Sequence, residues 1–184
     1  MIRTGGWSTT TIAIASAAGA TFLLSSCDDR RATVALPTQS ETPSRTPSVS
    51  ANSTDHQAVE RAYRKFIAIL DQADSLPKSG RKKQLSTHMV EPQLSKVLTT
   101  IEQHQANKVS SYGISVVHIK SIAIKESEAT VNDCLDSSKA GMRDTTTRRK
   151  INRGIRRESI TTTLKKGSDQ RWRVSKYVVL GEGC

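Results

Sequence analysis

Apolar positions between residues 55 and 110 recur every three or four residues, the spacing of one helix face. The first such face contains Val59, Ala62, Tyr63, Phe66, Leu70 and Ala73. Thr54-x-x-Gln57 resembles a capping box, so this helix is expected to begin at Thr54. Pro77 and Gly80 are helix breakers and are expected to end it.

Two further helices are expected in the same region. A short basic helix is predicted over residues 81–88. Pro92 stands at the favoured first position of a third helix. The apolar side of that helix consists of Leu94, Val97, Leu98 and Ile101.

From Ser111 onward the pattern becomes that of β-strands. One long, bent strand is expected to contain Ile114, Val116, Val117, Ile119, Ile122 and Ile124. A turn at 125–127 leads to a second strand over 129–134, and a loop with Gly141 follows. A third strand is expected through Ile155, Ile160, Thr162 and Leu164. After a turn at 167–169, alternating residues from Trp172 to Val178 predict the fourth strand. Helices followed by a meander of four strands predict an α+β domain.

The region before this domain has the composition of an export signal and a tether. Arg3 is followed by an uncharged stretch of small and apolar residues over 11–24. As a helix this stretch would be about 21 Å long, shorter than a hydrocarbon core of about 30 Å. Residues 28–54 are rich in Ser, Thr and Pro, a composition typical of disorder. The expected organisation is a signal peptide over 1–26, a tether over 27–54 and one domain over 55–184.

Leu24-Ser25-Ser26-Cys27 is similar to the lipobox of bacterial lipoproteins. That resemblance implies that Cys27 receives diacylglycerol on its sulfur and becomes the N-terminus after residues 1–26 are cleaved. Two or more acyl chains hold a protein stably on a membrane, whereas one does not. The expected location is therefore the extracytoplasmic face of the cell membrane. An ordinary secretory signal followed by an unrelated cysteine is the alternative.

The two other cysteines, Cys134 and Cys184, are expected to form a disulfide. An exported protein lies in an oxidising compartment, where two remaining thiols usually pair. The bridge would pin the C-terminus to the second strand. A reactive or metal-binding thiol pair is the alternative, although the chain has no C-x-x-C and no metal-ligand spacing.

The chain resembles small actinobacterial lipoproteins that carry a nuclear-transport-factor-2-like (NTF2-like) domain. Besides the lipobox and tether, the resemblance rests on Ala62-Tyr63-Arg64-Lys65-Phe66, Tyr112-Gly113, the segment from Ala129 to Asp136, Trp172-Arg173-Val174 and the terminal cysteine. It covers most of residues 55–184. The implied fold has N-terminal helices packed on a curved four-stranded antiparallel sheet, which forms a cone with an open mouth. This fold is found in isomerases, dehydratases, binding modules and extracellular parts of secretion and conjugation machines, so it does not choose a function.

Enzymes of this fold place an aspartate inside the cone as general base, with His or Tyr in some members. The resemblance makes Asp133, Asp136 and His118 the catalytic candidates. The alternative is that both aspartates cap a strand end beside the disulfide and that His118 is an ordinary strand residue. The chain has no P-loop and no G-x-S-x-G, and no metal or other cofactor is expected.

The charge of the chain indicates an anionic partner. The full chain has a net charge of +11, and loss of residues 1–26 removes Arg3 alone, which leaves 27 basic and 17 acidic residues, or +10. Seven basic residues lie close together in the sequence: Arg143, Arg148, Arg149, Lys150, Arg153, Arg156 and Arg157. Outside a cell such a run faces anionic lipid, wall polymer or extracellular DNA. A solvated hairpin edge is the alternative. The chain has no RNA-binding sheet motif and no helix-turn-helix, and the expected location argues against a role with intracellular nucleic acid.

These observations favour a non-catalytic accessory lipoprotein that binds other components of the cell envelope, such as those of a secretion or conjugation system. A small-ligand carrier that uses the cone pocket is the alternative, favoured if the mouth is apolar and closed below. An isomerase or dehydratase would require an aspartate deep in that pocket with a raised pKa.

Overall fold

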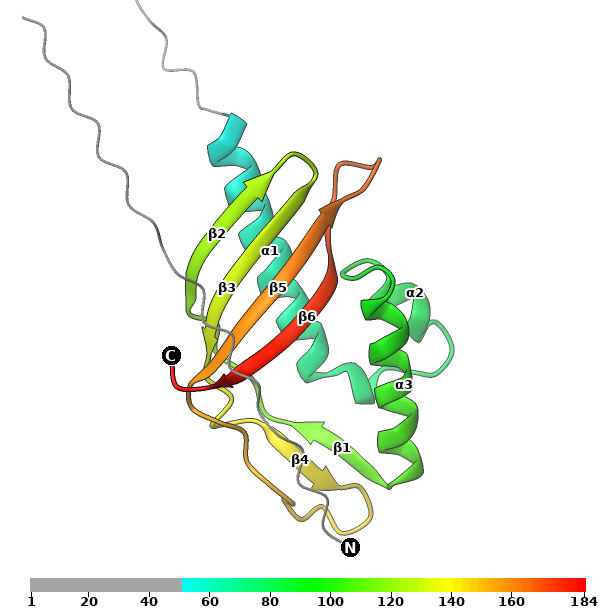
Figure 1. Ribbon diagram of the computed structural model, residues 1–184. Helices are drawn as coiled ribbons and strands as arrows, with labels where there is room; N and C mark the ends of the chain where they lie inside the picture. The colour runs from blue at the N-terminus through cyan, green and yellow to red at the C-terminus, as the bar shows by residue number, and fades with distance from the viewer. Residues whose placement is uncertain (1–50) are drawn as a thin grey trace, which may run out of the picture. The chain divides into compact units, whose positions relative to one another are not determined.

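The computed structural model describes residues 51–184 and contains four helical segments followed by six strands (Figure 1). The helical segments are α1 (Ala51–Asp71), the 3-10 helix η1 (Ala73–Ser75), α2 (Arg81–Leu85) and α3 (Gln93–Ala106). The strands are β1 (Val109–Tyr112), β2 (Ile119–Lys125), β3 (Glu128–Leu135), β4 (Gly141–Asp144), β5 (Glu158–Lys166) and β6 (Trp172–Glu182). The signal peptide and Cys27 lie outside the described residues.

The three predicted helices are present, but α1 begins earlier than expected. It starts at Ala51, so Thr54 lies inside the helix and does not cap it. Residues 51–54, which the composition assigned to the tether, are helical. No proline or glycine separates Pro47 from Pro77 in the sequence, so nothing interrupts the helix at Thr54.

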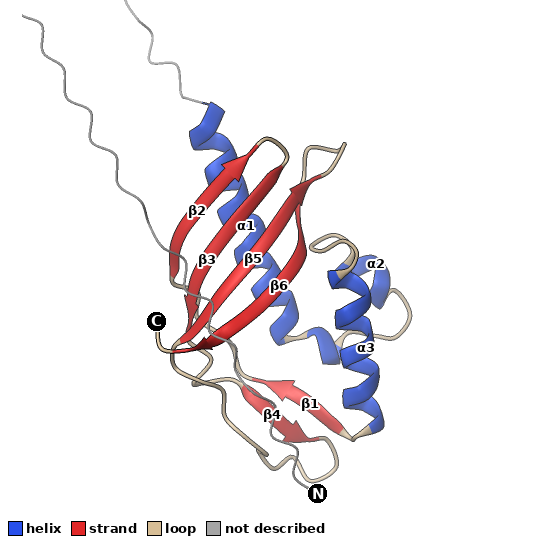
Figure 2. Cartoon of the chain, viewed as in Figure 1, coloured by secondary structure: helices blue, strands red, loops and turns tan. Residues whose placement is uncertain are grey.

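The main sheet is the predicted antiparallel meander, with strand order β2-β3-β5-β6. Val131 of β3 pairs with Thr162 of β5, which pairs in turn with Tyr177 of β6. The sheet is curved, with α1 across one face and α3 beside β6 (Figure 2). The α+β prediction is therefore confirmed.

The core lies between the sheet and the apolar faces of the helices. Its fully buried side chains include Val59, Tyr63, Phe66, Leu85, Met89, Val131, Ile160, Leu164 and Val174. The helical spacing of the first apolar face thus identified core residues correctly.

The long strand expected after Ser111 is present only from Ile119 onward, as β2. Ile114, Val116 and Val117 lie in the segment between β1 and β2, where Val116 forms an isolated bridge with Asp136. β1 pairs with β4 in a small second sheet, whereas β2 pairs with β3 in the main sheet. The chain changes direction at Gly113, where φ is +79° and a Cβ atom would lie 2.0 Å from the carbonyl oxygen of Lys139. Only glycine fits such a close approach without a shift. The apolar run therefore did not define one strand.

Two smaller expectations about the strands were also wrong. Gly141 begins β4 and does not lie in a loop, because β1 supplies a partner. Ile155 lies outside β5, and its carbonyl oxygen accepts a hydrogen bond from the Ser137 N–H at 2.7 Å.

The structure joins Cys134 and Cys184 in a disulfide, with their Cα atoms 5.7 Å apart. This confirms the predicted pairing. The bond joins Cys184, which follows β6, to Cys134 of β3. The disulfide therefore connects two strands that are separated in the sheet by β5.

Candidate binding pocket

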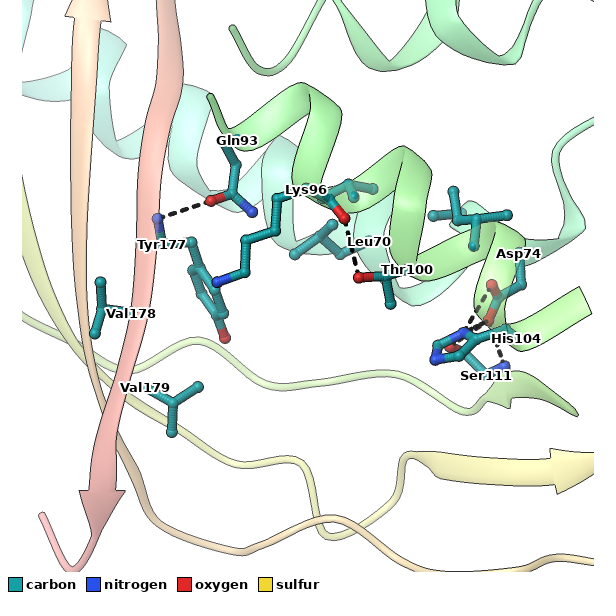
Figure 3. Close-up of a pocket in the computed structure, with 13 residues that line it drawn as sticks. Leu70, Asp74, Gln93, Lys96, Thr100, His104, Ser111, Tyr177, Val178 and Val179 are labelled. Atoms are coloured by element: carbon teal, nitrogen blue, oxygen red, sulfur yellow. Dashed lines mark hydrogen bonds and ion pairs between the residues drawn. The ribbon is translucent and has the colours of Figure 1, made fainter. Parts of the chain in front are cut away.

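A pocket of about 520 Å³ lies between α3, the end of α1 and the strands β1 and β6 (Figure 3). It is open to solvent. Its apolar lining is formed by Leu70, Ala73, Val97, Ile101 and Val179. Its polar lining includes Asp74, Gln93, Lys96, Thr100 and His104. Most of these residues come from α3, because positions three, four and seven apart share a helix face.

Tyr177 forms the inner wall of this pocket. Its ring contacts that of Phe66, with centroids 5.5 Å apart. Burial raises the pKa of the Tyr177 hydroxyl above its ordinary value, and the carboxylates of Glu158, Asp133 and Asp71 add to the increase. The hydroxyl is therefore neutral at physiological pH. Lys96 extends from α3 toward this ring and is exposed at the rim (Figure 3).

Asp74 links three elements at one end of the pocket. One of its carboxylate oxygens accepts hydrogen bonds from the N–H and hydroxyl of Ser111, both at 2.7 Å. Its other oxygen lies 3.0 Å from Nδ1 of His104. Both oxygens therefore have partners, and the carboxylate connects η1, α3 and β1. Sequence reasoning missed this group, because 30 residues separate Asp74 from His104 and no local motif joins them.

The catalytic candidate Asp133 lies inside the domain and does not line the pocket. It is 2% exposed, and its Oδ2 accepts a hydrogen bond from the hydroxyl of Tyr63 at 2.9 Å. Its Oδ1 has no hydrogen-bond partner among the described residues. The pKa of Tyr63 is raised, chiefly by burial and then by the charge of Asp133. The pair is enclosed in the core.

The other two catalytic candidates lie elsewhere. His118 is exposed, in the segment before β2. Oδ1 of Asp136 accepts a hydrogen bond from the Ser138 N–H at 2.9 Å, and Ser138 is the main reason for the lowered pKa of Asp136. The expected set of Asp133, Asp136 and His118 is therefore not assembled around one pocket. Within residues 51–184, no group of three potential ligands is arranged to hold a metal ion.

The seven basic residues lie on β4 and the loop from β4 to β5, away from the pocket. Arg143 is half-buried and donates from Nε to Oγ of Ser110, while Nζ of Lys150 lies 4.7 Å from the centre of the Tyr112 ring. The remaining five are exposed: Arg148, Arg149, Arg153, Arg156 and Arg157. None of the seven forms an ion pair with another described residue. The five exposed side chains are accessible to an external partner. We call these residues the basic surface.

No helix in the described part of the chain is both long and apolar enough to span a bilayer. No protein-family model matches the sequence, and no curated protein matches it.

Solved structures resemble the domain in fold. The intermembrane-space region of the chloroplast protein ARC6 has a TM-score of 0.56 and 13% identity, over 68% of this chain and 96% of that region. An NTF2-like superfamily protein from Salmonella enterica serovar Typhimurium has a TM-score of 0.50 and 12% identity, over 73% of this chain and 95% of that protein. At such identities the likeness extends to the fold alone. The domain has an NTF2-like fold, with helices packed on a curved antiparallel sheet.

Proposed function

We propose that the protein is a lipid-anchored binding module on the extracytoplasmic face of a bacterial membrane, and that it binds through the pocket between α3 and β6 without catalysing a reaction. The observation that carries this proposal is the separation of the pocket from the buried carboxylate. A general base must come within hydrogen-bond reach of its substrate. Asp133 is enclosed in the core, whereas the pocket has an apolar floor and its own carboxylate, Asp74, is already paired.

Three observations support the envelope location. The lipobox ending at Cys27 implies an acylated N-terminus. The Cys134–Cys184 disulfide fits an oxidising compartment. The ARC6 region, described as lying in an intermembrane space, has the same fold. The expected partner is another envelope component, such as part of a secretion or conjugation system.

Lipidation is tested by growth with labelled palmitate. The wild-type protein should incorporate label and sediment with membranes, and Cys27→Ser should do neither. Label and membrane association that persist in Cys27→Ser would contradict the anchor.

Pocket binding is tested with the anionic apolar dye anilinonaphthalene sulfonate, on residues 27–184 carrying Cys27→Ser. The parent should bind one dye per chain, saturably. Thr100→Trp fills the pocket and should weaken binding at least tenfold. Thr99→Trp places the same side chain on the exposed side of α3, outside the pocket, and should bind as the parent does. Equal binding by both variants, with unchanged thermal unfolding, would refute the pocket as the site.

The basic surface is proposed to hold the anchored domain near anionic lipid or wall polymer. Each cation near such a surface contributes about 1 kcal/mol at most, and salt screens it. The fourfold Gln variant of Arg148, Arg149, Arg153 and Arg156 should lose low-salt binding to anionic vesicles. A matched fourfold Gln variant of the exposed Arg61, Lys78, Lys82 and Lys83 should retain it. Unchanged binding by the first variant would show that the basic surface is a solvated strand edge that does not bind vesicles.

A further inference from the structure

The pocket lies between two strand edges. β6 is the last strand of the main sheet and pairs with β5, and β1 pairs with β4 in the small sheet. Tyr177 and Val179 of β6 line the pocket, and so does Ser111 of β1. Figure 2 shows that β6 and β1 belong to separate sheets.

Along β6, the outer edge is covered in its first half and uncovered in its second. The Val174 N–H donates to the His88 carbonyl at 3.0 Å, and the Val174 carbonyl accepts from the Val90 N–H at 2.8 Å. The Tyr177 N–H then donates to Oε1 of the Gln93 side chain at 3.1 Å. Beyond Tyr177, no strand among the described residues pairs with this edge.

Val179 carries the next pair of outward backbone groups. In an antiparallel pair, alternate residues direct their N–H and C=O toward the same side. Val179 is two residues beyond Tyr177 in the same register with β5, so its N–H and C=O point to the pocket side. On β1, the side-chain carboxylate of Asp74 accepts the Ser111 N–H. At both borders of the pocket, a backbone N–H therefore donates to a side chain and not to another strand: Tyr177 to Gln93, and Ser111 to Asp74.

The two edges of the main sheet also differ in composition. β2, the other edge, carries Lys120 and Lys125, and charged side chains on an edge strand discourage strand pairing. The segment from Tyr177 to Gly181 has no charged side chain. Val179 is 51% exposed and Leu180 is 64% exposed. An uncharged, apolar and uncovered edge is open to another strand.

We propose that an extended, acidic peptide segment of an envelope partner adds to the β6 edge beyond Tyr177, at Val179, with its alternate apolar side chains in the pocket against Val97 and Ile101. This inference rests on the proposed function of the same pocket. In strand addition, main-chain hydrogen bonds supply affinity and pockets for alternate side chains supply specificity.

The charges around the pocket favour an acidic peptide. Lys96 is exposed at the rim, and both oxygens of Asp74 already have partners. A second copy of this chain would bring its own large excess of positive charge. The open backbone groups of Val179 favour a polypeptide over a lipid chain, because an acyl chain has no hydrogen-bonding groups to pair with them.

The test uses a synthetic acetylated peptide of alternating Val and Thr that ends in two Asp residues, with residues 27–184 carrying Cys27→Ser. Two analogues are N-methylated, one at every Val and one at every Thr. A peptide paired as a strand directs one set of amides to β6, so one analogue should bind at least tenfold more weakly than the other. Equal binding by both analogues would show apolar docking without strand pairing and would overturn the inference.

Variants of Val179 separate the backbone from the side chain. Val179→Pro removes the edge N–H and leaves the pairing of Val178 with Thr161. It should weaken peptide binding at least tenfold, while Val179→Ala, which retains the N–H, should bind peptide more tightly than Val179→Pro does. A homodimer on gel filtration that Val179→Pro dissociates would show that a second copy occupies the edge and would overturn the inference.

The dye separates this inference from the proposed function. Dye binding without peptide binding would overturn strand addition and leave the pocket as a small-ligand site. Loss of both would refute the pocket itself.

Discussion

The two halves of strand β6 have the same neighbour in the sheet but opposite surroundings. In the first half, Trp172 is 5% exposed and Val174 is fully buried. In the second half, Val179 and Leu180 are more than half exposed. The first half is covered by α1 and the segment around His88, whereas the second half borders the open pocket. Figure 1 shows how β6 runs from the side of α2 and α3 toward the C-terminus.

The difference shows that burial along a strand depends on what packs against it. Both halves of β6 pair with β5. Core packing stabilises the first half, while the second half keeps apolar side chains exposed to solvent. Exposed apolar surface beside a pocket is the reason for the docking proposal above, because contiguous apolar patches often mark interaction sites.

Truncation of one large side chain in each half should give the largest contrast. Trp172→Ala removes a buried ring and should lower the free energy of unfolding by about 3–5 kcal/mol. Leu180→Ala removes an exposed side chain and should change it by less than about 0.5 kcal/mol. Urea unfolding followed by circular dichroism measures both. Similar losses would mean that the second half is covered in solution.

Removal of the disulfide should have the next largest effect and should act on the second half. In the double variant Cys134→Ser, Cys184→Ser, loss of a bridge across 50 residues should cost about 2–4 kcal/mol. Amide exchange should rise more over 178–182 than over 172–176, because the bond restrains the end beyond β6. Uniform acceleration along β6 would contradict this local role.

Gln93 marks the boundary between the two halves. Gln93→Ala leaves the Tyr177 N–H without its acceptor and should cost about 1 kcal/mol. Exchange of the Tyr177 amide should become faster. Gln103→Ala, on the exposed side of α3, is the control and should change neither quantity. If the Tyr177 amide is equally protected in Gln93→Ala, another group covers the edge.

The covered half should also give a small dependence of stability on pH. Burial, and then the charge of Lys65, lowers the pKa of His88, so the folded protein binds a proton there less readily than the unfolded chain. Stability from this group is complete above the ordinary histidine pKa of about 6.5 and is lost as pH falls through the folded value. The thermal midpoint should therefore fall between pH 7 and 5, and by less in His88→Gln. An equal fall in both proteins would exclude His88 as a cause.

Much of the fold was predictable because local patterns encode it. Helical spacing identified Tyr63 and Phe66 as core residues, and alternation with turn residues predicted most of the main sheet. Two cysteines left over in a chain that we expected to be exported predicted the disulfide. The break at Gly113 was missed, because it depends on the approach of Lys139, a residue 26 positions away in the sequence.

The chain by itself determined the order of the three helices and the meander of the main sheet, the cysteine pair and the run of basic residues, since each depends on neighbouring residues or on residue type. Tertiary structure alone decided the rest. It enclosed Asp133 against Tyr63, joined Asp74 to His104, and left Val179 exposed on the strand that buries Val174. The sequence does not distinguish Val174 from Val179, because the elements that cover Val174 and leave Val179 exposed come from distant parts of the chain.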